Sequence, residues 1–573
     1  MDQATDSEGD ARRAGSGRSL TRAVRSGVRK GLDLLAQVPG IIIERYAPNV
    51  QGFLADRQPL VWLLALLIGL AVAYAAIVFR LAIGFFQLPW LMTSSERVAS
   101  AAAELPWWQL LLGPTIGGLI VGTVLERWMP GRRAHAVADV IEARAVRDSR
   151  IDPKVGLLSA GLAALSLGSG ASAGREGPVV HLGATLAALI QARLDLSAGA
   201  RRTLLGCGVA AAVSASFNAP IAGMLFAHEV ILAHYAMRAF VPIVISSVVA
   251  AAIARHHFGN FPAFVIPEYQ ITSYLEFPAF ALLGVTCALV AIMFEFALMV
   301  TERLTWRIDM PLPLRTMLTG LMVGLIALVF PQVLGVGYET TDQALYQKLP
   351  LWLLLSLILA KTAATAISLA GRFAGGIFSP SLYLGAITGA AFGSIAVAAF
   401  PDLGASHGLY AILGMGAVAA AVLGAPISTT LIVFELTGGY QMTIALLLTV
   451  SISVGLTQAF LGQSYFHWQL GKRGLFLQEG PHKSIVRQLK VRDFMTPLEP
   501  AEQVDPISGQ DEPWLLASDT LERALRAYDH SGRARIPVVA DNDPTRIVAW
   551  ADRMAALSAF NKALIDSHVE QHR

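Results

Sequence analysis

Long apolar segments recur along this chain from Leu60 to Leu470, and they decide what the chain can fold into. A helix of about 20 apolar residues crosses the hydrocarbon core of a bilayer. Only 15% of the residues are charged, whereas about a quarter are charged in soluble proteins. The sequence therefore predicts an all-α polytopic membrane protein. The predicted apolar segments are Pro59–Leu88, Trp107–Leu125, Val155–Gln191, Leu204–Tyr235, Phe240–Ala254, Phe277–Val300, Met317–Val329, Leu351–Leu369, Gly375–Ala399, Leu409–Leu423, Ala425–Leu436 and Thr443–Phe460.

The first 30 residues are basic and have no apolar core, so they do not form a signal peptide. This basic excess predicts a cytoplasmic N-terminus, and we expect the C-terminus on the same side of the inner (plasma) membrane. Ser19–Ala36 carries a basic face at helical spacing, which predicts an amphipathic interfacial helix; a disordered tail is the alternative. The net charge of +3 is too small to indicate nucleic-acid binding. Cys207 and Cys287 lie inside apolar runs, which is typical of packing residues rather than of a disulfide or a metal site.

Two parts of the membrane region repeat each other. Gly174-x-x-x-Pro178-x-x-x-Leu182-Gly183-Ala184 matches Gly376-x-x-x-Pro380-x-x-x-Leu384-Gly385-Ala386, and Ala219-Pro220-Ile221 with Glu229 matches Ala425-Pro426-Ile427 with Glu435. Chance similarity in Ala/Gly-rich sequence is the alternative, but the Pro and Glu positions match as well. Helices broken by Gly and Pro at corresponding positions of two halves are the best sequence indication of a transport site at the repeat interface near the membrane midplane.

The stretch Gly174-Arg175-Glu176-Gly177-Pro178 opens a helical pattern between two apolar runs. Gly and Pro at this position predict a helix start with exposed backbone amides. Such amides attract anions, and Glu176 is itself an anion. We therefore predict a competition, in which a charged Glu176 fills an anion site and vacates it when protonated or displaced. An ion pair between Arg175 and Glu176 is the structural alternative.

From Val491 onward the composition is that of a soluble protein. An acidic linker, 497–513, precedes a predicted helix (Thr520–Asp529), two strands (Ile536–Val539 and Ile547–Trp550) and a last helix (Arg553–Leu564). These elements predict one small cytoplasmic α/β module. The predicted parts of the chain are a cytoplasmic tail (1–57), a first transmembrane half (58–257), a loop (258–275), a second transmembrane half (276–472) and a linker with the module (473–573).

Four motifs together resemble those of the CLC chloride channel/transporter family. They are Gly174-Arg-Glu-Gly-Pro178, Phe217-Asn-Ala-Pro-Ile-Ala-Gly223, Gly375-Gly-Ile-Phe-Ser-Pro380 and Leu436-Thr-Gly438. The resemblance covers roughly Leu60 to Gly471 and implies an antiparallel inverted repeat of broken, tilted helices. It also implies a homodimer with a separate anion pore in each subunit. Val491-Arg-Asp-Phe-Met-Thr-Pro497 and Ile536-Pro-Val-Val539 resemble parts of a CBS domain, present here as a single repeat.

The resemblance implies roles for individual residues. Glu176 matches the external gating glutamate, at a helix N-terminus formed by Gly174, Arg175, Gly177 and Pro178. The backbone amides of Ile377 and Phe378, with Gly376 beside them, match those that bind the central anion. Amide dipoles at helix ends supply partial positive charge without a fixed cation that would trap a transported halide.

The chain departs from the family pattern at three positions. Where the family commonly has a serine that touches the anion, this chain reads Ala134-His135-Ala136, so His135 stands near that place. The family's central tyrosine aligns with Phe466, and Tyr465 substitutes only if the register shifts by one residue. Where many proton-coupled members have an internal glutamate, this chain has Val230; His228, beside Glu229, is the spare candidate for an internal proton step.

Several further residues carry alternatives. His181 either packs and bonds backbone or takes part in the site. Glu229 and Glu435, at matching repeat positions, are expected to be structural. Lys361 and Arg372 are expected to snorkel or pair, with a role in drawing anions inward as the alternative. In nucleotide-binding CBS modules a Thr or Ser and an Asp hold the ribose, whereas the matching positions here are Asp552 and Ala555, so a dimer clamp is favoured over nucleotide binding.

The function expected from this pattern is transport of small monovalent anions, chloride above all, gated by Glu176, with no cofactor and no enzymatic activity. Passive transport and proton-coupled exchange both remain open, with the absence of the internal glutamate and the central tyrosine favouring a channel or an unusual transporter. From another class, a transport-inactive membrane sensor acting through the C-terminal module is the rival hypothesis. No cluster of His and Cys has metal-binding spacing.

Overall fold

The computed structural model describes residues 50–51, 53–54, 57–259, 274–400, 407–437, 440–476, 486, 489–498, 513–540 and 543–572. The chain divides into two units, Met1–Leu63 and Leu64–Arg573. In the first unit, the rings of Phe53 and Trp62 meet edge to face with centroids 5.2 Å apart. The predicted interfacial helix Ser19–Ala36 lies outside the described residues, as do most of the predicted tail, of the loop 258–275 and of the linker 497–513.

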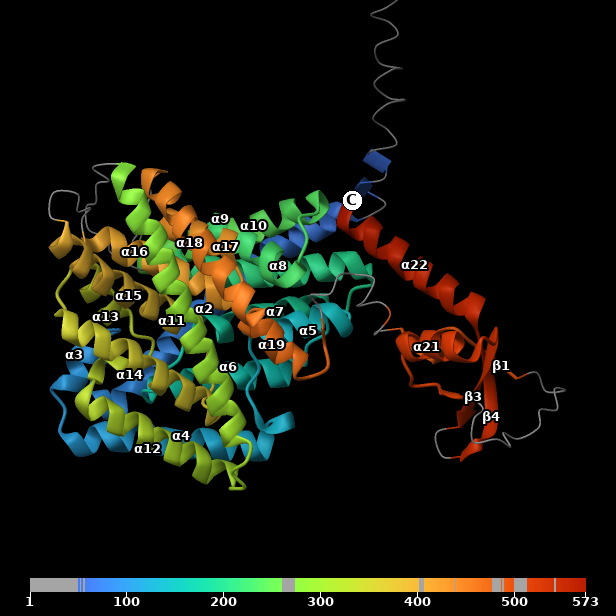
Figure 1. Cartoon of the computed structure of the whole chain (residues 1–573), viewed down its shortest axis with the longest axis horizontal. Coiled ribbons are helices and arrows are strands. Elements are labelled where there is room, and N and C mark those ends of the chain that lie inside the picture. The colour runs from blue at the N-terminus through green and yellow to red at the C-terminus, as the bar shows by residue number, and fades with distance from the viewer. Residues whose placement is uncertain are drawn as a thin grey trace, which may run out of the picture. The chain divides into compact units, whose positions relative to one another are not determined.

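Helices make up almost all of the described chain up to Gly471 (Figure 1). Eight helices within the described ranges are long and apolar enough to cross a membrane, which confirms the predicted polytopic helical fold. The elements are α2 (Gln58–Leu91), α3 (Val98–Ala103), α4 (Trp107–Trp128), η1 (Pro130–Arg132), α5 (Val137–Val146), α6 (Pro153–Gly168), α7 (Glu176–Gln191), α8 (Ala198–Phe217), α9 (Pro220–Phe226), η2 (Ala227–Leu232), α10 (Met237–Phe258), η3 (Tyr274–Glu276), α11 (Phe277–Thr305), α12 (Leu312–Val329), η4 (Pro331–Val333), α13 (Tyr338–Leu345), α14 (Leu351–Ala370), α15 (Phe378–Ala399), α16 (His407–Leu423), α17 (Pro426–Thr437), α18 (Tyr440–Leu461) and α19 (Tyr465–Gly471).

Two of the predicted apolar segments are broken into shorter helices. Val155–Gln191 contains α6 and α7, which are separated at Gly170, a glycine with a φ of 97°. Leu204–Tyr235 contains α8, α9 and the π-helix η2, with a left-handed Asn218 between α8 and α9. Pro220 then opens α9, where its missing amide costs nothing. These breaks place helix ends within the membrane part, which is tolerated only where they are buried or line a cavity.

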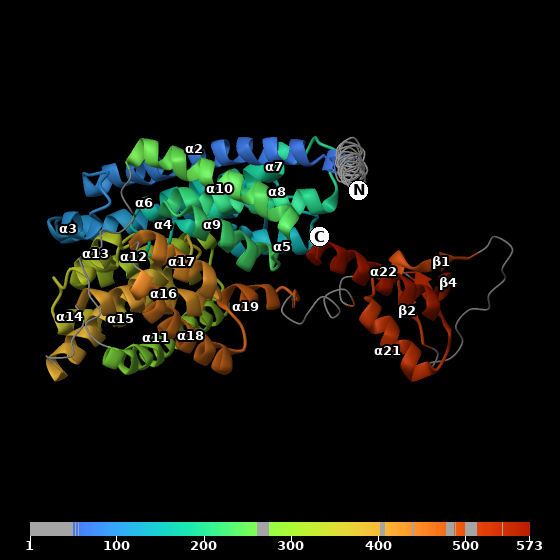
Figure 2. The ribbon, with the colours of Figure 1, turned by 90° about the horizontal axis from the view of Figure 1, so that it is seen from above.

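The helices of the membrane part form two groups, with α2–α10 on one side and α11–α18 on the other in Figure 2. α7 packs on α8 in the first half as α15 packs on α16 in the second. Gly183 and Gly208 make the close approach in the first pair, and Gly385 and Gly414 make it in the second. α8 and α16 are buried over most of their length, because Ala- and Gly-rich helices that are apolar all round can be enclosed by neighbours.

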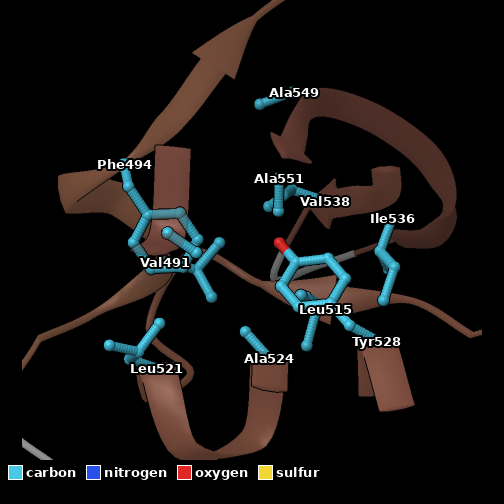
Figure 3. Close-up of a cluster of buried hydrophobic side chains, with 11 residues drawn as sticks. Val491, Phe494, Leu515, Leu521, Ala524, Tyr528, Ile536, Val538, Ala549 and Ala551 are labelled. Atoms are coloured by element: carbon cyan, nitrogen blue, oxygen red, sulfur yellow. The ribbon is translucent and has the colours of Figure 1, made fainter. Parts of the chain in front are cut away.

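The C-terminal module is a four-stranded sheet of order β1-β4-β3-β2 with two helices. Its elements are η7 (Val491–Asp493), β1 (Met495–Pro497), β2 (Leu515–Leu516), α21 (Leu521–Ser531), β3 (Arg535–Ala540), β4 (Asp543–Asp552) and α22 (Arg553–His572). β4 is antiparallel to β1 and β3, and β2 is parallel to β3. Figure 3 shows its core, a cluster of buried side chains that includes Leu521 and Tyr528 of α21, Val538 of β3 and Ala551 of β4. The predicted small α/β module is thus confirmed.

Candidate functional site

The chain segments that lead into α7 and α15 meet at a reciprocal pair of backbone hydrogen bonds. The amide of Gly174 donates to the carbonyl oxygen of Gly376 at 2.7 Å, and the amide of Gly376 donates to that of Gly174 at 2.8 Å. A Cβ on Gly376 would lie 3.1 Å from the amide nitrogen of Gly177, so a larger residue would force the two segments apart. The bridge joins corresponding glycines of the two repeats. The amide of Gly376, predicted beside the bound anion, is therefore already hydrogen-bonded.

Two helix N-termini consequently meet at one place. The N-cap residues, Arg175 for α7 and Ile377 for α15, make no side-chain cap bond. The first amides of a helix have no intrahelical acceptor, and the helix dipole adds partial positive charge there. Both helices carry a proline at their third position, Pro178 and Pro380. The result is a concentration of positive dipole ends at one place.

Glu176 lies in this place with its side chain 1% exposed. Its Oε1 accepts a hydrogen bond from the hydroxyl of Tyr338 at 2.5 Å, and its Oε2 accepts one from the hydroxyl of Ser379, in the first turn of α15. The carboxylate of the first repeat thus occupies the helix start of the second. This is the geometry that the predicted competition requires.

Arg175 interacts with Glu176, but its shorter ion pair is with another acid. Its Nε lies 3.8 Å from Oε1 of Glu176, whereas its Nη1 lies 2.5 Å from Oε1 of Glu96. The guanidinium also covers the ring of Tyr338 at 4.7 Å from the centroid. Desolvation of the partly exposed Glu96 carboxylate opposes its charge, but Arg175 and Arg80 outweigh this effect and lower the pKa of Glu96. Arg175 therefore lies closer to Glu96 than to Glu176.

A cavity of about 250 Å³, here called the inner cavity, opens on one side of this helix junction. It is bordered by four basic residues and two acidic ones, which are Arg133, Arg372, Lys472, Arg473, Asp139 and Glu302. Eight of the predicted site residues lie in its wall, namely His135, Gly177, Pro178, Gly376, Ile377, Phe378, Tyr465 and Phe466. The structure thus gathers residues that are more than 300 positions apart in the sequence around one space.

A second cavity of about 280 Å³, the outer cavity, lies beyond Tyr338. Arg80, Glu96 and Arg175 line it together with the segment Gly335–Tyr338. Glu176 neighbours residues of both cavities, since it accepts a hydrogen bond from Tyr338 of the outer cavity and directly precedes Gly177 of the inner one. Within the described residues, no group of three or more His, Cys, Asp or Glu side chains is placed to hold a metal ion.

Comparison with known proteins identifies the family. The model of the voltage gated chloride channel family matches residues 117–458. The chain belongs to this family, for which we keep the short name CLC. A ClcB-like protein of Ralstonia nicotianae is 34% identical over 67% of this chain and 90% of its own length. The voltage-gated ClC-type chloride channel ClcB of an Escherichia coli strain is 30% identical over 72% of this chain and 98% of its own.

Solved CLC structures share the fold. A slow cyanobacterial Cl⁻/H⁺ antiporter superposes with a TM-score of 0.65 over 73% of this chain and 99% of that one, at 22% identity. A CLC-type fluoride/proton antiporter gives a TM-score of 0.60 over 71% of this chain and 97% of that one, at 21% identity. These likenesses confirm the CLC-type architecture inferred from the motifs.

His135, at the first departure from the family pattern, lies in the wall of the inner cavity. Its backbone amide donates to the hydroxyl of Ser159 at 3.1 Å, and its Nδ1 lies 4.0 Å from a carboxylate oxygen of Asp139. Burial lowers the pKa of His135; Asp139 opposes this effect, and the guanidinium of Arg133 adds to it. The imidazole is therefore neutral at neutral pH.

At the second departure, the structure brings both aromatic candidates to the same wall. Tyr465 and Phe466 open α19, are 5% exposed each and line the inner cavity. The ring of Tyr465 stacks on that of Trp468 with centroids 5.6 Å apart. Both candidates named for the family's central tyrosine therefore lie in the cavity wall.

At the third departure, the predicted internal proton step lies away from both cavities, since neither His228 nor Glu229 lines them. The Nδ1 of His228 is 2.8 Å from the carbonyl oxygen of His234. The carboxylate of Glu229 accepts the amides of Ile427 and Ser428 at 2.9 and 2.7 Å. Glu229 is therefore a cap of α17, which is the structural role expected for it.

Lys361 does not snorkel or pair with an acid as predicted. It is fully buried in α14, and its Nζ donates to the carbonyl oxygens of Val333 and Gly335 at 3.0 Å each. These carbonyls belong to the turn that leads into Tyr338. Lys361 thus binds the turn that precedes Tyr338, the residue whose hydroxyl donates a hydrogen bond to Glu176. Arg372, in contrast, lines the inner cavity. This position is compatible with the alternative role, in which Arg372 draws anions inward.

Sequence reasoning missed three residues that surround Glu176, which are Tyr338, Ser379 and Glu96. Ser379 stands inside the quoted motif Gly375–Pro380, so its position was a usable signal. Tyr338 follows two glycines with positive φ, Gly335 and Gly337, but a Gly-Val-Gly stretch is too common to predict a gate contact. Glu96 gave no signal, because its partner Arg175 is 79 residues away.

Proposed function

We propose that this protein carries small monovalent anions, chloride above all, across the membrane through the inner cavity, past Glu176, to the outer cavity. The observation that carries the proposal is the position of the Glu176 carboxylate at the N-terminus of α15, beside the hydroxyl of Ser379. A negative charge is stabilised there by the helix amides and dipole. A halide and the carboxylate compete for this place, so Glu176 acts as the gate.

The charge distribution supports this path. Arg133, Arg372, Lys472 and Arg473 border the inner cavity and raise the local concentration of anions. The innermost wall, Gly376–Phe378, has no cationic side chain, so an anion is bound by dipoles and released readily. The Escherichia coli relative named as a chloride channel and the solved chloride/proton and fluoride/proton antiporters support anions as the substrate class.

Anion efflux from liposomes containing the purified protein tests the proposal. Wild type is expected to release chloride, and Glu176→Gln, which mimics a protonated gate, is expected to release it at a rate that no longer rises with acid. Glu104→Gln, a change at an exposed acid, is the matched control and should behave as wild type. Flux in Glu176→Gln that still rises with acid as in wild type would exclude Glu176 as the gate.

The same preparation decides between a channel and an exchanger. We keep proton-coupled exchange as the second candidate, because two solved relatives are named as proton antiporters. A reversal potential that shifts with a pH gradient identifies coupling, and one that ignores it identifies a channel. If purified protein moves no anion at all, the rival hypothesis of a transport-inactive membrane sensor, acting through the C-terminal module, is favoured.

We further propose a homodimer with one pore in each subunit, in the inner (plasma) membrane, with both termini in the cytoplasm. The family resemblance and the basic N-terminal segment support this arrangement. In the C-terminal module, Asp552 caps the following helix through the amide of Met554 at 2.8 Å. This favours a structural module over one that binds a nucleotide. Native mass spectrometry in detergent, with and without added ATP, tests both statements.

A further inference from the structure

The ring of His135 contacts a second histidine, His181. The ring of His181, from α7, meets the ring of His135 edge to face with centroids 5.5 Å apart. His181 lies five residues after Glu176 on the same helix and is 1% exposed. His135 lines the inner cavity. The pair therefore connects a fully buried imidazole with the wall of the anion path.

Both ring nitrogens of His181 lack a hydrogen-bond partner among the described residues. A neutral imidazole carries one N–H donor and one acceptor nitrogen. A buried polar group without a protein partner indicates an unseen water or ion, because native proteins rarely leave such groups without a hydrogen bond. His181 thus keeps a donor and an acceptor free beside His135, which is what a group that takes up a proton requires.

We propose that His135 and His181 together form a proton-binding site whose occupancy is coupled to anion binding in the inner cavity. This inference rests on the proposed function. It gives the chain a titratable pair in the wall of the inner cavity, and it supplies a proton acceptor that is not Glu229.

The charges around the pair set the sign of the coupling. Asp139 faces both histidines, but Arg133 and Arg473 bind its carboxylate at 2.5 and 2.9 Å and neutralise it. Arg147 pairs with Glu142 nearby. The remaining charges facing the cavity are Arg372, Lys472 and Glu302 from other elements. The surroundings are therefore net positive and disfavour protonation until an anion enters.

An anion in the inner cavity compensates this positive field and raises the proton affinity of the pair. By reciprocity, a proton on the pair must raise the affinity for the anion by the same factor. Coupling between two sites is commonly worth about 5-fold to 150-fold in affinity. We therefore expect chloride to bind at least about fivefold more tightly when the pair is protonated.

The test measures chloride binding by isothermal titration calorimetry to the full chain in detergent. All variants carry Glu176→Gln, so that the gate carboxylate does not contribute to the pH dependence. Chloride is titrated at about pH 7.5 and about pH 5, which bracket the range in which histidine titrates. The Glu176→Gln protein is expected to bind chloride more tightly at the lower pH, by about fivefold or more.

Adding His181→Phe or His135→Phe should remove this difference. His181→Gln, which keeps a polar side chain but takes up no proton, should remove it as well and guards against a packing defect. His256→Phe, at an exposed histidine of α10, is the matched control and should retain it. Equal affinity at both pH values in Glu176→Gln, or an unchanged difference after His181→Phe and His181→Gln, would overturn the proposal.

The outcome separates this inference from the proposed function. Chloride flux by wild type together with pH-independent binding overturns the histidine site alone. Absence of both flux by wild type and binding to Glu176→Gln overturns the proposed function, and the histidine site with it.

Discussion

Glu229 and Glu435 cap each other's repeat. The carboxylate of Glu229, in the first half, accepts hydrogen bonds from the amides of Ile427 and Ser428 at the start of α17. The carboxylate of Glu435, in the second half, accepts hydrogen bonds from the amides of Ile221 and Ala222 at the start of α9. Each glutamate therefore satisfies amides that its partner helix cannot satisfy itself. Each half thus supplies a carboxylate that caps a helix of the other half, as expected for an inverted repeat.

We predict that Glu229→Gln and Glu435→Gln each destabilise the membrane part, on the order of 2 kcal/mol, because a charged acceptor is lost at a helix N-terminus. Thermal unfolding in detergent measures the effect. Glu126→Gln, at an exposed acid of α4, is the control and should be neutral. Neither variant should alter the preference among anions. A change in selectivity without loss of stability would contradict the capping role.

Gly376→Ala is predicted to impair both stability and flux. Its Cβ would lie 3.1 Å from the amide nitrogen and 3.2 Å from the Cα of Gly177, so the backbone of one repeat must shift. Overpacking of this kind costs about 1–3 kcal/mol. Gly161→Ala in α6 is the control, since no heavy atom lies within 4 Å of the added Cβ. Equal flux and melting temperature in the two variants would show that the glycine bridge does not set the gate geometry.

Tyr338→Phe is predicted to raise chloride flux at neutral pH about tenfold. The hydroxyl of Tyr338 donates to Glu176, and a hydrogen bond to a charged group contributes about 1.5–3 kcal/mol, which corresponds to a tenfold or larger shift in gate occupancy. Liposome efflux measures the rate. In a Glu176→Gln background the effect should shrink to nearly nothing. Tyr346→Phe, at an exposed tyrosine, should leave efflux unchanged. A similar rise in that variant would exclude a specific role of the Tyr338 hydroxyl in holding Glu176 in place.

Glu96→Gln is predicted to reduce stability in a pH-dependent manner. Desolvation of the partly exposed Glu96 carboxylate opposes its charge, but Arg175 and Arg80 lower its pKa below the ordinary value of 4.5. A depressed carboxyl pKa stabilises the fold above the pKa of the unfolded chain, and this contribution is lost as the pH falls through the folded pKa. The difference in melting temperature between wild type and Glu96→Gln should be constant above about pH 5 and shrink below about pH 4. Glu104→Gln should show no such difference, and a gap that widened in acid would contradict the assigned pairing.

Tyr528→Phe in the C-terminal module is predicted to be neutral or stabilising. The ring is fully buried, and its hydroxyl has no hydrogen-bond partner among the described residues. Burial, with a contribution from Asp552, raises the pKa of Tyr528 to about 12, so the hydroxyl stays neutral. Removing an unsatisfied buried hydroxyl recovers up to about 1–3 kcal/mol. Limited proteolysis of the full chain in increasing urea measures module stability; faster cleavage of Tyr528→Phe would mean that the hydroxyl has a stabilising partner.

The sequence alone determined the fold class and the inverted repeat, and it indicated Glu176 as the candidate gate. Apolar length and low charge required membrane helices, because no other element satisfies its backbone in lipid. The motif around Glu176 and its repeat at Gly376 were sufficient to identify two helix starts and one carboxylate, since Gly and Pro act locally on the backbone. The module's helices and strands also followed from local patterns. The breaks inside the long apolar segments were not predicted at particular residues. They occur at Gly170 and Asn218, which adopt left-handed backbone conformations.

The tertiary structure decided which residues surround the gate and which do not. Tyr338, Ser379 and Glu96 come from three segments far apart in the sequence and touch Glu176 or its neighbour only because the two repeats are packed face to face. The same packing brings the carboxylate of Glu229 to the start of α17, where it acts as a cap, and it places the ring of His181 against that of His135. Long-range contacts depend on how helices pack, and no local pattern of residue types encodes which side chains then meet.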